Sequence, residues 1–302
     1  MQDKSTYVEV LIMKRISVIL LIFSTVIIPT VMAQDNVITF EVGLAKVTLL
    51  SEGQRTSGTN VLVGATEEMI KQAIPNGTYP GATNVFLVEI AGKAVLIDAG
   101  LGKKTIENLE FYGKKAAEID AIFITHLHGD HIGSLILNDV KSYPKAMLYI
   151  SKPEYDSYME NANMRKLFDT YKDQIYTFMP GEIDNAKELI PGLKAIAAYG
   201  HTPGHTGFLL ESDDSKLLFW GDLTHAMAIQ MPFPEVAMTY DSDKAKAIET
   251  RQKLLNYLSD DYIRIAGAHI QYPGIGYLSK RVDNGYDFTL LCGCEGVYPD
   301  VK

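Results

Sequence analysis

Apolar and polar residues alternate along the chain with two different periods. Stretches with a period of two predict strands, and stretches with a helical period predict helices. The predicted strands cover residues 37–42, 45–50, 84–90, 94–98, 121–124, 147–150, 193–199, 208–211, 217–220 and 263–267. The predicted helices cover residues 67–73, 105–112 and 244–258, with two more inside 152–171 and one that starts after residue 131. Strand pairs that alternate with helices indicate sheets covered by helices on their outer faces.

The first 33 residues have the pattern of a signal peptide. Lys14 and Arg15 precede an apolar run over residues 16–28, and small residues lead to Ala33. We therefore expect residues 1–33 to be a signal peptide, with residues 1–12 an upstream extension. The remaining residues 34–302 would form one domain of a periplasmic or secreted protein without stable membrane insertion. A retained membrane anchor is the alternative, although the run is shorter than the roughly 20 residues that a span needs.

The charge balance limits the partners of the protein. The 302-residue chain has a formal net charge of −9 at pH 7 and no cluster of Lys and Arg, whereas nucleic-acid binding relies on such clusters. We therefore expect a small-molecule substrate and no nucleic acid. Apolar residues near the N-terminus of the mature chain leave room for a homodimer. Cys292 and Cys294 are one residue apart, where a disulfide would be strained, and they do not bear on function.

Four side chains of metal-ligand type fall within six residues, directly after the predicted strand 121–124. They are His126, His128, Asp130 and His131, and Gly129 marks a loop among them. If these imidazoles were protonated they would repel one another, and if they were neutral and buried they would need many partners; a bound cation resolves both problems. A solvated His-rich loop is the less favoured interpretation.

Further candidate ligands lie at the ends of other predicted strands. His and carboxylate ligands suit zinc, with iron or manganese as alternatives. We predict one metal held by His126, His128 and His205, and a second held by Asp130, His131 and His269. Asp222 could bridge the two metals. Three to four protein ligands on each metal leave a position for water, which is typical of a catalytic site.

These motifs resemble the metallo-β-lactamase superfamily of dinuclear metallohydrolases. The resemblance rests on residues 96–100, 125–131, 202–206, 221–222 and 267–269. Residues 220–225, 233–236, 240–243 and 268–276 are closer still to the methyl parathion hydrolase branch, which itself resembles acyl-homoserine lactonases. The resemblance implies an α+β fold, a four-layered αββα sandwich with two Zn²⁺ at one edge. It also implies hydrolysis of ester-like bonds (lactone, aryl ester or phosphotriester) by a metal-bridging hydroxide.

Other functions remain open at this point. An exported β-lactamase-type hydrolase is one alternative, and a di-iron oxidoreductase of the same fold is another, although no flavin domain is attached. The acidic charge disfavours a nuclease. A metal-binding protein without catalytic activity is the remaining alternative, and the full ligand set disfavours it.

The family pattern and the positions of the remaining residues suggest individual roles. The pattern places the ligand at His205, so His201 is expected to support the site. Asp130 and His225 are the predicted catalytic residues, with His225 donating a proton to the leaving group or supporting another residue. Asp98 is expected to orient an imidazole rather than bind metal.

Several aromatic residues have two interpretations each. In the helices predicted within 152–171, aromatic residues and Met recur at helical spacing, and we interpret them as a core face rather than a cap over the active site. Trp220 is expected in the core. Phe233, Tyr240 and Tyr272 are candidates for the pocket wall.

Overall fold

The computed structural model describes residues 36–291. The predicted signal peptide and both cysteines lie outside these residues. Two seven-stranded sheets form the centre of the fold. The first sheet has the order β1 (Val37–Val42), β2 (Ala45–Gly58), β4 (Thr78–Ile90), β5 (Lys93–Ile97), β6 (Ala121–Phe123), β9 (Met147–Ser151) and β10 (Ile175–Phe178). The second has the order β11 (Lys187–Ile190), β12 (Leu193–Ala197), β13 (Thr206–Ser212), β14 (Ser215–Phe219), β16 (Arg264–Ala266), β17 (Ile275–Lys280) and β18 (Tyr286–Leu290).

Helices and two small strand pairs complete the described part of the chain. The strand pairs are β3 (Leu62–Val63) with β15 (Ala237–Met238), and β7 (Ile136–Leu137) with β8 (Val140–Lys141). The α-helices are α1 (Glu67–Ala73), α2 (Lys103–Tyr112), α3 (Gly129–Ile132), α4 (Lys152–Tyr158), α5 (Ala162–Tyr171), α6 (Met227–Gln230) and α7 (Lys244–Asp260). Within residues 36–291, no helix is long and apolar enough to span a membrane.

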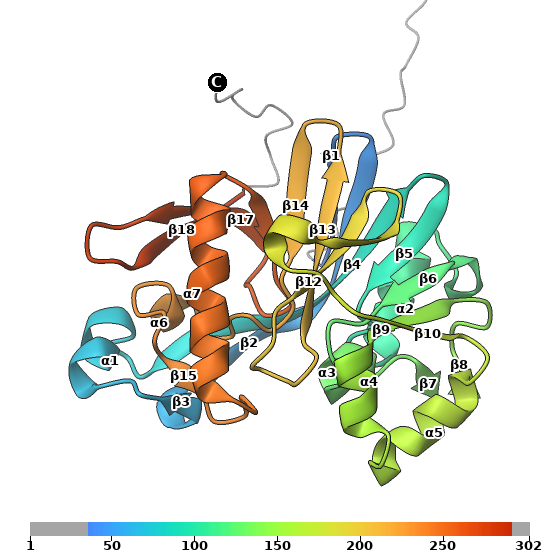
Figure 1. Ribbon diagram of the computed structural model, residues 1–302, viewed down its shortest axis with the longest axis horizontal. Helices are drawn as coiled ribbons and strands as arrows, with labels where there is room; N and C mark the ends of the chain where they lie inside the picture. The colour runs from blue at the N-terminus through green and yellow to red at the C-terminus, as the bar shows by residue number, and fades with distance from the viewer. Residues whose placement is uncertain (1–35, 292–302) are drawn as a thin grey trace, which may run out of the picture. The chain divides into compact units, whose positions relative to one another are not determined.

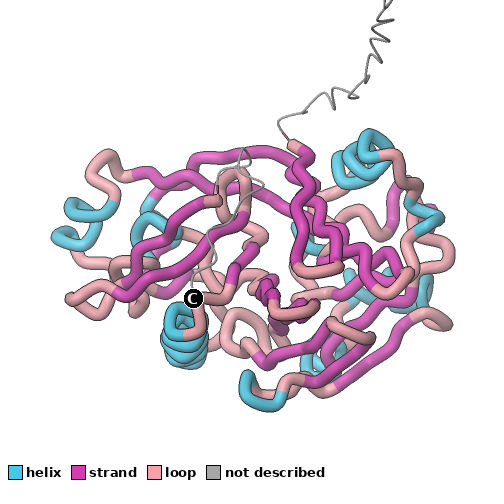
Figure 2. Tube along the Cα trace, turned by 90° about the horizontal axis from the view of Figure 1, so that it is seen from above, coloured by secondary structure: helices cyan, strands magenta, loops and turns pink. Residues whose placement is uncertain are grey.

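Alternate residues of each central strand enter different cores, as the pleat of a strand requires. In β4, Phe86 and Val88 face the core between the two sheets, whereas Val85 and Leu87 face the core between the first sheet and its helices. In β14, Leu218 faces a third core against α7. Helices therefore cover both outer faces, and in Figure 1 α7 (orange) and the pair α4 and α5 (green) lie on opposite sides of the strands. Figure 2 shows the helices outside the strands. The predicted αββα sandwich is confirmed.

Most predicted elements are present, with extended bounds in some cases. The strand expected at 45–50 continues to Gly58 as β2, and β4 begins at Thr78 rather than residue 84. The two helices expected within 152–171 are α4 and α5. The helix expected after residue 131 is instead the single turn α3, which ends at Ile132. Strands β10, β11, β17 and β18 were not predicted, because they are short and their apolar residues do not alternate clearly.

The aromatic residues of α4 and α5 confirm the core-face interpretation. Leu167 and Phe168 are buried in the core under the first sheet, and Tyr155, Tyr158 and Met164 pack against the same core. Met159 is the exception, with its side chain 48% exposed. Trp220 is fully buried against α7, as predicted.

Candidate metal centre

The candidate ligands come from loops that follow strands of both sheets. His126, His128 and His131 follow β6, His201 follows β12, Asp222 follows β14 and His269 follows β16. Strand-end loops on a rigid sheet core place side chains with little freedom, which favours a preorganised site. A backbone hydrogen bond joins the loop after β6 to the end of the loop after β12, because the Thr206 N–H donates to the Thr125 carbonyl (2.9 Å).

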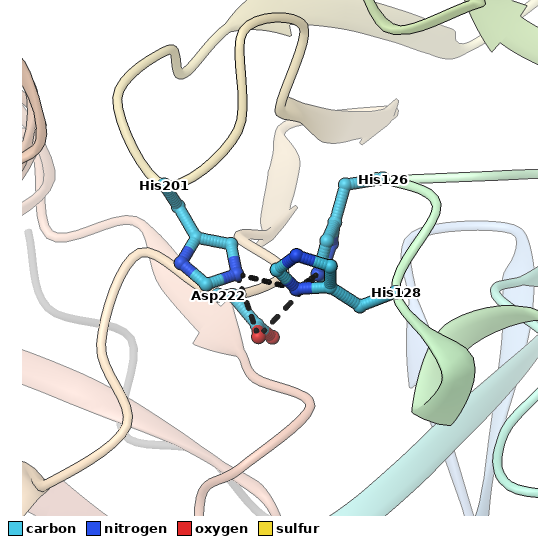
Figure 3. Close-up of side chains that lie close together, drawn as sticks. All are labelled: His126, His128, His201 and Asp222. Atoms are coloured by element: carbon cyan, nitrogen blue, oxygen red, sulfur yellow. Dashed lines mark hydrogen bonds and ion pairs between the residues drawn. The ribbon is translucent and has the colours of Figure 1, made fainter. Parts of the chain in front are cut away.

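Three imidazoles meet at one point of this edge. His128 Nδ1 lies 3.0 Å from His126 Nε2 and 3.0 Å from His201 Nε2. Asp222 Oδ2 lies 3.6 Å from His126 Nε2 and 3.3 Å from His201 Nε2. Figure 3 shows the three rings and the carboxylate converging. Nitrogens bound to one tetrahedral Zn²⁺ are about 3.3 Å apart, given Zn–N bonds of about 2.0–2.1 Å. We refer to His126, His128, His201 and Asp222 as the first cluster.

The outer nitrogens of two of these rings are held by hydrogen bonds. His201 Nδ1 lies 2.8 Å from Asp241 Oδ1, and His126 Nδ1 lies 3.1 Å from Thr125 Oγ1. Since Thr125 Oγ1 donates to Asp98 (2.9 Å), it accepts from His126. Both rings then carry a proton on Nδ1 and direct Nε2 into the cluster. An imidazole oriented in this way by an outer hydrogen bond is typical of metal ligands.

A second group of candidate ligands lies on the other side of Asp222. His131 Nε2 is 3.0 Å and His269 Nε2 is 3.1 Å from Asp222 Oδ1. Asp130 is more loosely placed, 3.8 Å from His131 Nε2 and 3.6 Å from His269 Nε2, and its side chain is 30% exposed. The predicted hydrogen bond between Asp98 and an imidazole is present, because the His131 Nδ1–H donates to Asp98 Oδ2 (2.7 Å). We refer to Asp130, His131, His269 and Asp222 as the second cluster.

Buried atoms without partners indicate that these residues fit a cation. Seven buried side-chain atoms of the described residues have no hydrogen-bond partner, and two of them, His131 Nε2 and Asp222 Oδ1, face each other at 3.0 Å in the second cluster. A buried polar atom without a partner costs about 1–3 kcal/mol, so such atoms call for an explanation. A cation between His131, His269 and Asp222 would satisfy both. The donor set of imidazoles and carboxylates suits zinc, iron or manganese.

The pKa shifts of the cluster residues go in two directions. Burial would lower the pKa of His201 and of His131, but nearby carboxylates raise it, to about 9 for His201 and well above the ordinary value for His131, so a cation there would have to displace a proton. Burial lowers the pKa of His128 to about 4 and holds the pKa of His126 well below its ordinary value, so both rings are neutral and can donate a lone pair. Burial alone would raise the pKa of Asp222, but the surrounding imidazoles, first His131 and then His269, hold it well below the usual range. Asp222 is therefore a carboxylate that faces both clusters.

His205 does not lie where the sequence analysis placed it. Its Nε2 accepts from the backbone N–H of Asp222 (2.9 Å), and its Nδ1 donates to the Ala198 carbonyl (2.9 Å). Both nitrogens are therefore used, and no lone pair remains for a metal. The prediction of His205 as a ligand is wrong in this geometry, and His201 takes that place in the first cluster. His205 directly precedes β13, and its ring is held there by the Ala198 carbonyl and the Asp222 N–H.

Gly221 makes the contact between His205 and Asp222 feasible. Its backbone has a φ of +55°, which favours glycine, and a Cβ there would lie only 2.6 Å from His205 Nε2. The Gly-Asp motif after β14 therefore lets the Asp222 N–H reach His205 while its carboxylate turns to the clusters.

A buried carboxylate ties together the two loops of the first cluster. Glu154, at the start of α4, is fully buried. Its Oε1 accepts from the backbone N–H of Leu127 (2.9 Å), which lies between His126 and His128. Its Oε2 accepts from Thr202 Oγ1 (2.6 Å) and the Gly204 N–H (3.0 Å), beside His201. Glu154 was not predicted from the sequence, because its partners are 27 to 50 positions away in the chain.

Residues of both clusters line a pocket with a volume of about 460 Å³: His128, Asp130, His201, Asp222 and His269. His225 lines it, with its ring stacked on that of His269 (5.0 Å between centroids) and its Nε2 2.7 Å from Asp222 Oδ2. Tyr240 packs edge-on against His225 (4.9 Å) and is 42% exposed. Of the three predicted wall residues, Tyr240 therefore lines the pocket. Phe233 instead packs in an apolar cluster with α1 and α6 residues.

One pocket residue was not foreseen from the sequence. Arg55 lies in the extension of β2 beyond the predicted strand end. Its Nη1 donates to the Ala82 carbonyl (2.6 Å) and to Thr83 Oγ1 (2.9 Å), and its Nη2 lies 2.9 Å from His269 Nδ1. The positions of these partners along β4 follow from the β2–β4 pairing, in which Arg55 faces Gly81.

An αββα sandwich with a His/Asp cluster at its strand ends defines a class of metal-dependent hydrolases. The chain belongs to the metallo-β-lactamase superfamily, whose sequence pattern matches residues 78–269. YobT of Bacillus subtilis, an uncharacterised protein, is 32% identical over 187 residues, which are 57% of this chain and 77% of YobT.

Two solved structures share the fold. The hydrolase AbOPH of the β-lactamase superfamily is 25% identical with a TM-score of 0.77, covering 85% of this chain and 98% of its own. AidC, a dizinc quorum-quenching lactonase, is 22% identical with a TM-score of 0.76, covering 85% of this chain and 99% of its own. The resemblance inferred from the motifs is confirmed, and the protein is a metal-dependent hydrolase of this superfamily.

Proposed function

We propose that the protein is a dinuclear zinc hydrolase that cleaves ester-like bonds in small molecules: lactones, aryl esters or phosphotriesters. The motifs of the second half of the chain, which resemble the methyl parathion hydrolase branch, support this substrate class. The fold shared with AidC supports it only by analogy, because one fold carries many activities.

The observation that carries the proposal is the position of Asp222. Its two oxygens face different clusters, with Oδ2 3.3 Å from His201 Nε2 and Oδ1 3.0 Å from His131 Nε2. One carboxylate shared by two sets of imidazoles supports two cations close together rather than one. If two cations were held in this way, they would provide a nucleophilic water near neutral pH and a Lewis acid for the oxygens of the scissile group.

The residues around the cations would hold and orient the substrate. Asp130 and His225 line the pocket together with Asp222, which supports a role for both in moving protons. His225 Nε2 also contacts Asp222, so this ring holds the shared carboxylate as well. Tyr240 closes the side of the pocket next to His201 and His225.

A hydrolysis panel with purified protein loaded with zinc tests the proposal. The panel contains an acyl-homoserine lactone, a 4-nitrophenyl ester, methyl parathion and a cephalosporin. We expect turnover of at least one of the first three, with loss of turnover after chelation and recovery with two equivalents of zinc. Turnover of the cephalosporin alone would instead identify a β-lactamase, and iron rather than zinc in the purified protein would favour the oxidoreductase.

We further propose that the protein acts outside the cytoplasm on a small-molecule substrate, with no nucleic-acid partner. The signal-peptide pattern of residues 1–33 and the net charge of −9 support this proposal. Sequencing the N-terminus of the protein isolated from its native host tests the export, because cleavage after Ala33 leaves a chain that begins at Gln34.

A further inference from the structure

We propose that Arg55 binds an anionic substituent of the substrate, so that the preferred substrates are esters or lactones that also carry a carboxylate or phosphate. This inference rests on the proposed ester hydrolysis and narrows its substrate class. It stands on three observations: the fixed position of the guanidinium, its remaining donors, and the charge of the pocket.

The fold holds the guanidinium of Arg55 at the pocket wall. Two hydrogen bonds from Nη1 to Ala82 and Thr83 fix its plane, and Nη2 lies beside the imidazole of His269. The residue as a whole is nonetheless exposed, and it lines the same pocket as both clusters. A guanidinium held in this way loses little freedom on binding, and its planar donors match a carboxylate or phosphate.

The position of the proton on the His269 ring leaves N–H groups of Arg55 available to bind a ligand. If His269 Nε2 binds a cation, its proton is on Nδ1, where the Ala82 carbonyl accepts it (2.9 Å). A protonated Nδ1 cannot also accept from Arg55, although the two atoms are 2.9 Å apart. Because a guanidinium has five N–H groups and no acceptor, the Nη2 donors then need a partner, and the open side of the residue is the pocket.

The charge of the pocket also favours an anion. Among its described lining residues, the acidic side chains are Asp130 and Asp222, and both belong to the clusters. Two divalent cations would carry four positive charges, against the carboxylates of Asp130 and Asp222 and those of Asp98 and Asp241 behind the rings of His131 and His201. Arg55 therefore adds the uncompensated positive charge at the pocket wall, in a chain of net charge −9. Screening over about 8–10 Å limits the repulsion from the distant surface charges.

The pocket is large enough for one substrate to contact the cations with its scissile bond and Arg55 with its anionic group. Its volume of about 460 Å³ lies within the range of small-molecule sites, about 300–1,000 Å³. One imidazole ring, that of His269, separates Arg55 from the position between the clusters. A short aliphatic chain between the scissile bond and the anionic group would therefore reach from the cations to Arg55.

Two matched esters test the inference: mono-4-nitrophenyl glutarate, and its methyl ester, which lacks the charge. We expect the zinc-loaded enzyme to hydrolyse the acid with a kcat/KM at least about tenfold higher, as for a charge-assisted hydrogen bond. Arg55→Met keeps the aliphatic stem, and it should abolish this preference by raising the KM of the acid alone. Arg55→Lys should retain part of the preference, because it keeps the positive charge but not the planar pair of N–H donors of the guanidinium.

A binding measurement separates this inference from the proposed function. Glutarate binding, followed by calorimetry on the zinc-loaded protein, should weaken about tenfold or more in Arg55→Met, while elemental analysis still finds two equivalents of zinc. If neither ester is hydrolysed and the panel above is negative, the ester hydrolysis fails, and glutarate binding still reports on Arg55. Equal rates for the two esters in the wild type overturn the inference. So does an equal loss for both esters in Arg55→Met, which would mean that Arg55 acts only through His269.

Discussion

The two clusters of the metal centre differ in ligand type and in enclosure. The first is built from three imidazoles, with His128 Nδ1 3.0 Å from the Nε2 atoms of both His126 and His201, and His126 within it is fully buried. The second contains Asp130, whose side chain is 30% exposed and 3.6–3.8 Å from the two rings of that cluster. We therefore expect the first cluster to hold its cation more tightly and the second to exchange its cation with solvent more readily.

The hydrogen bonds that hold the ligands in place also differ between the two clusters. In the first, Asp241 and Thr125 fix the outer nitrogens of His201 and His126, and Glu154 joins the two loops that carry these rings. In the second, Asp98 fixes His131, but the carboxylate of Asp130 has no comparable tie among the described contacts. Outer hydrogen bonds of this kind typically change metal affinity or activity by about 10–100-fold.

The largest effect is expected from Asp222→Ala, because this carboxylate is the one group common to both clusters. Without it, the buried imidazoles on both sides lose the charge that draws two cations together. We expect loss of both metal equivalents and a fall in kcat/KM well beyond the about 100-fold that a supporting hydrogen bond accounts for. Elemental analysis after dialysis measures the metal content. Asp214→Ala, in the exposed turn between β13 and β14, is the matched control. Two equivalents of metal in Asp222→Ala would refute the shared role.

A pair of substitutions separates the two histidines of the loop before β13. His201→Ala should remove the metal of the first cluster, leaving about one equivalent, because it deletes one of three ring nitrogens. His205→Ala should keep two equivalents, since both its nitrogens bind backbone groups. It should instead lower the free energy of unfolding by about 1–3 kcal/mol for each buried backbone group left without a partner.

Metal analysis and denaturant unfolding, applied to both variants, read out this difference. The reverse result, with metal lost only in His205→Ala, would restore the assignment made from the sequence and contradict the first cluster as the structure shows it.

The choice between these two histidines also shows what sequence could not supply. Strand periodicity predicted sheets covered by helices, and the family resemblance carried by the motifs implied the αββα sandwich with its metal site at one edge. Candidate ligands at the ends of predicted strands then grouped His126, His128, His131 and His269. His201 and His205 are equivalent by residue type and lie four positions apart. Their roles depend on the path of the loop and on Asp241, which is 40 residues from His201. No local pattern encodes that contact.

Arg55 was missed for a related reason. The apolar alternation of the second strand ends at Leu50, and residues 51–58 are polar or small, which is typical of a loop. They form strand because β4 pairs with them up to Gly58, with a register shift between Ser51 and Gly53. Long-range pairing thus extended β2 and carried a cation to the pocket, whereas propensity alone favoured a loop.

The smallest effect concerns Glu154, which stabilises the first cluster without touching a candidate cation. In Glu154→Gln, one of the two oxygens becomes an NH₂ group. Because Oε1 faces the Leu127 N–H and Oε2 faces the Gly204 N–H, either orientation of the amide places a donor against a backbone donor. The loops of His126–His128 and His201 should then separate slightly. We expect the affinity for the metal of the first cluster to fall by about 10–100-fold, with the second cluster unchanged.

Titration of the zinc-loaded variant with chelators of graded affinity measures this change as a shift in the more tightly held equivalent. Asp156→Asn is the matched control, since Asp156 lies on the same helix and pairs only with Lys152 at the surface. If Glu154→Gln weakened the less tightly held equivalent instead, Glu154 would support the second cluster. The ranking of the two clusters by enclosure would then fail. If both equivalents shifted together, the two clusters would behave as one cooperative unit, joined through Asp222.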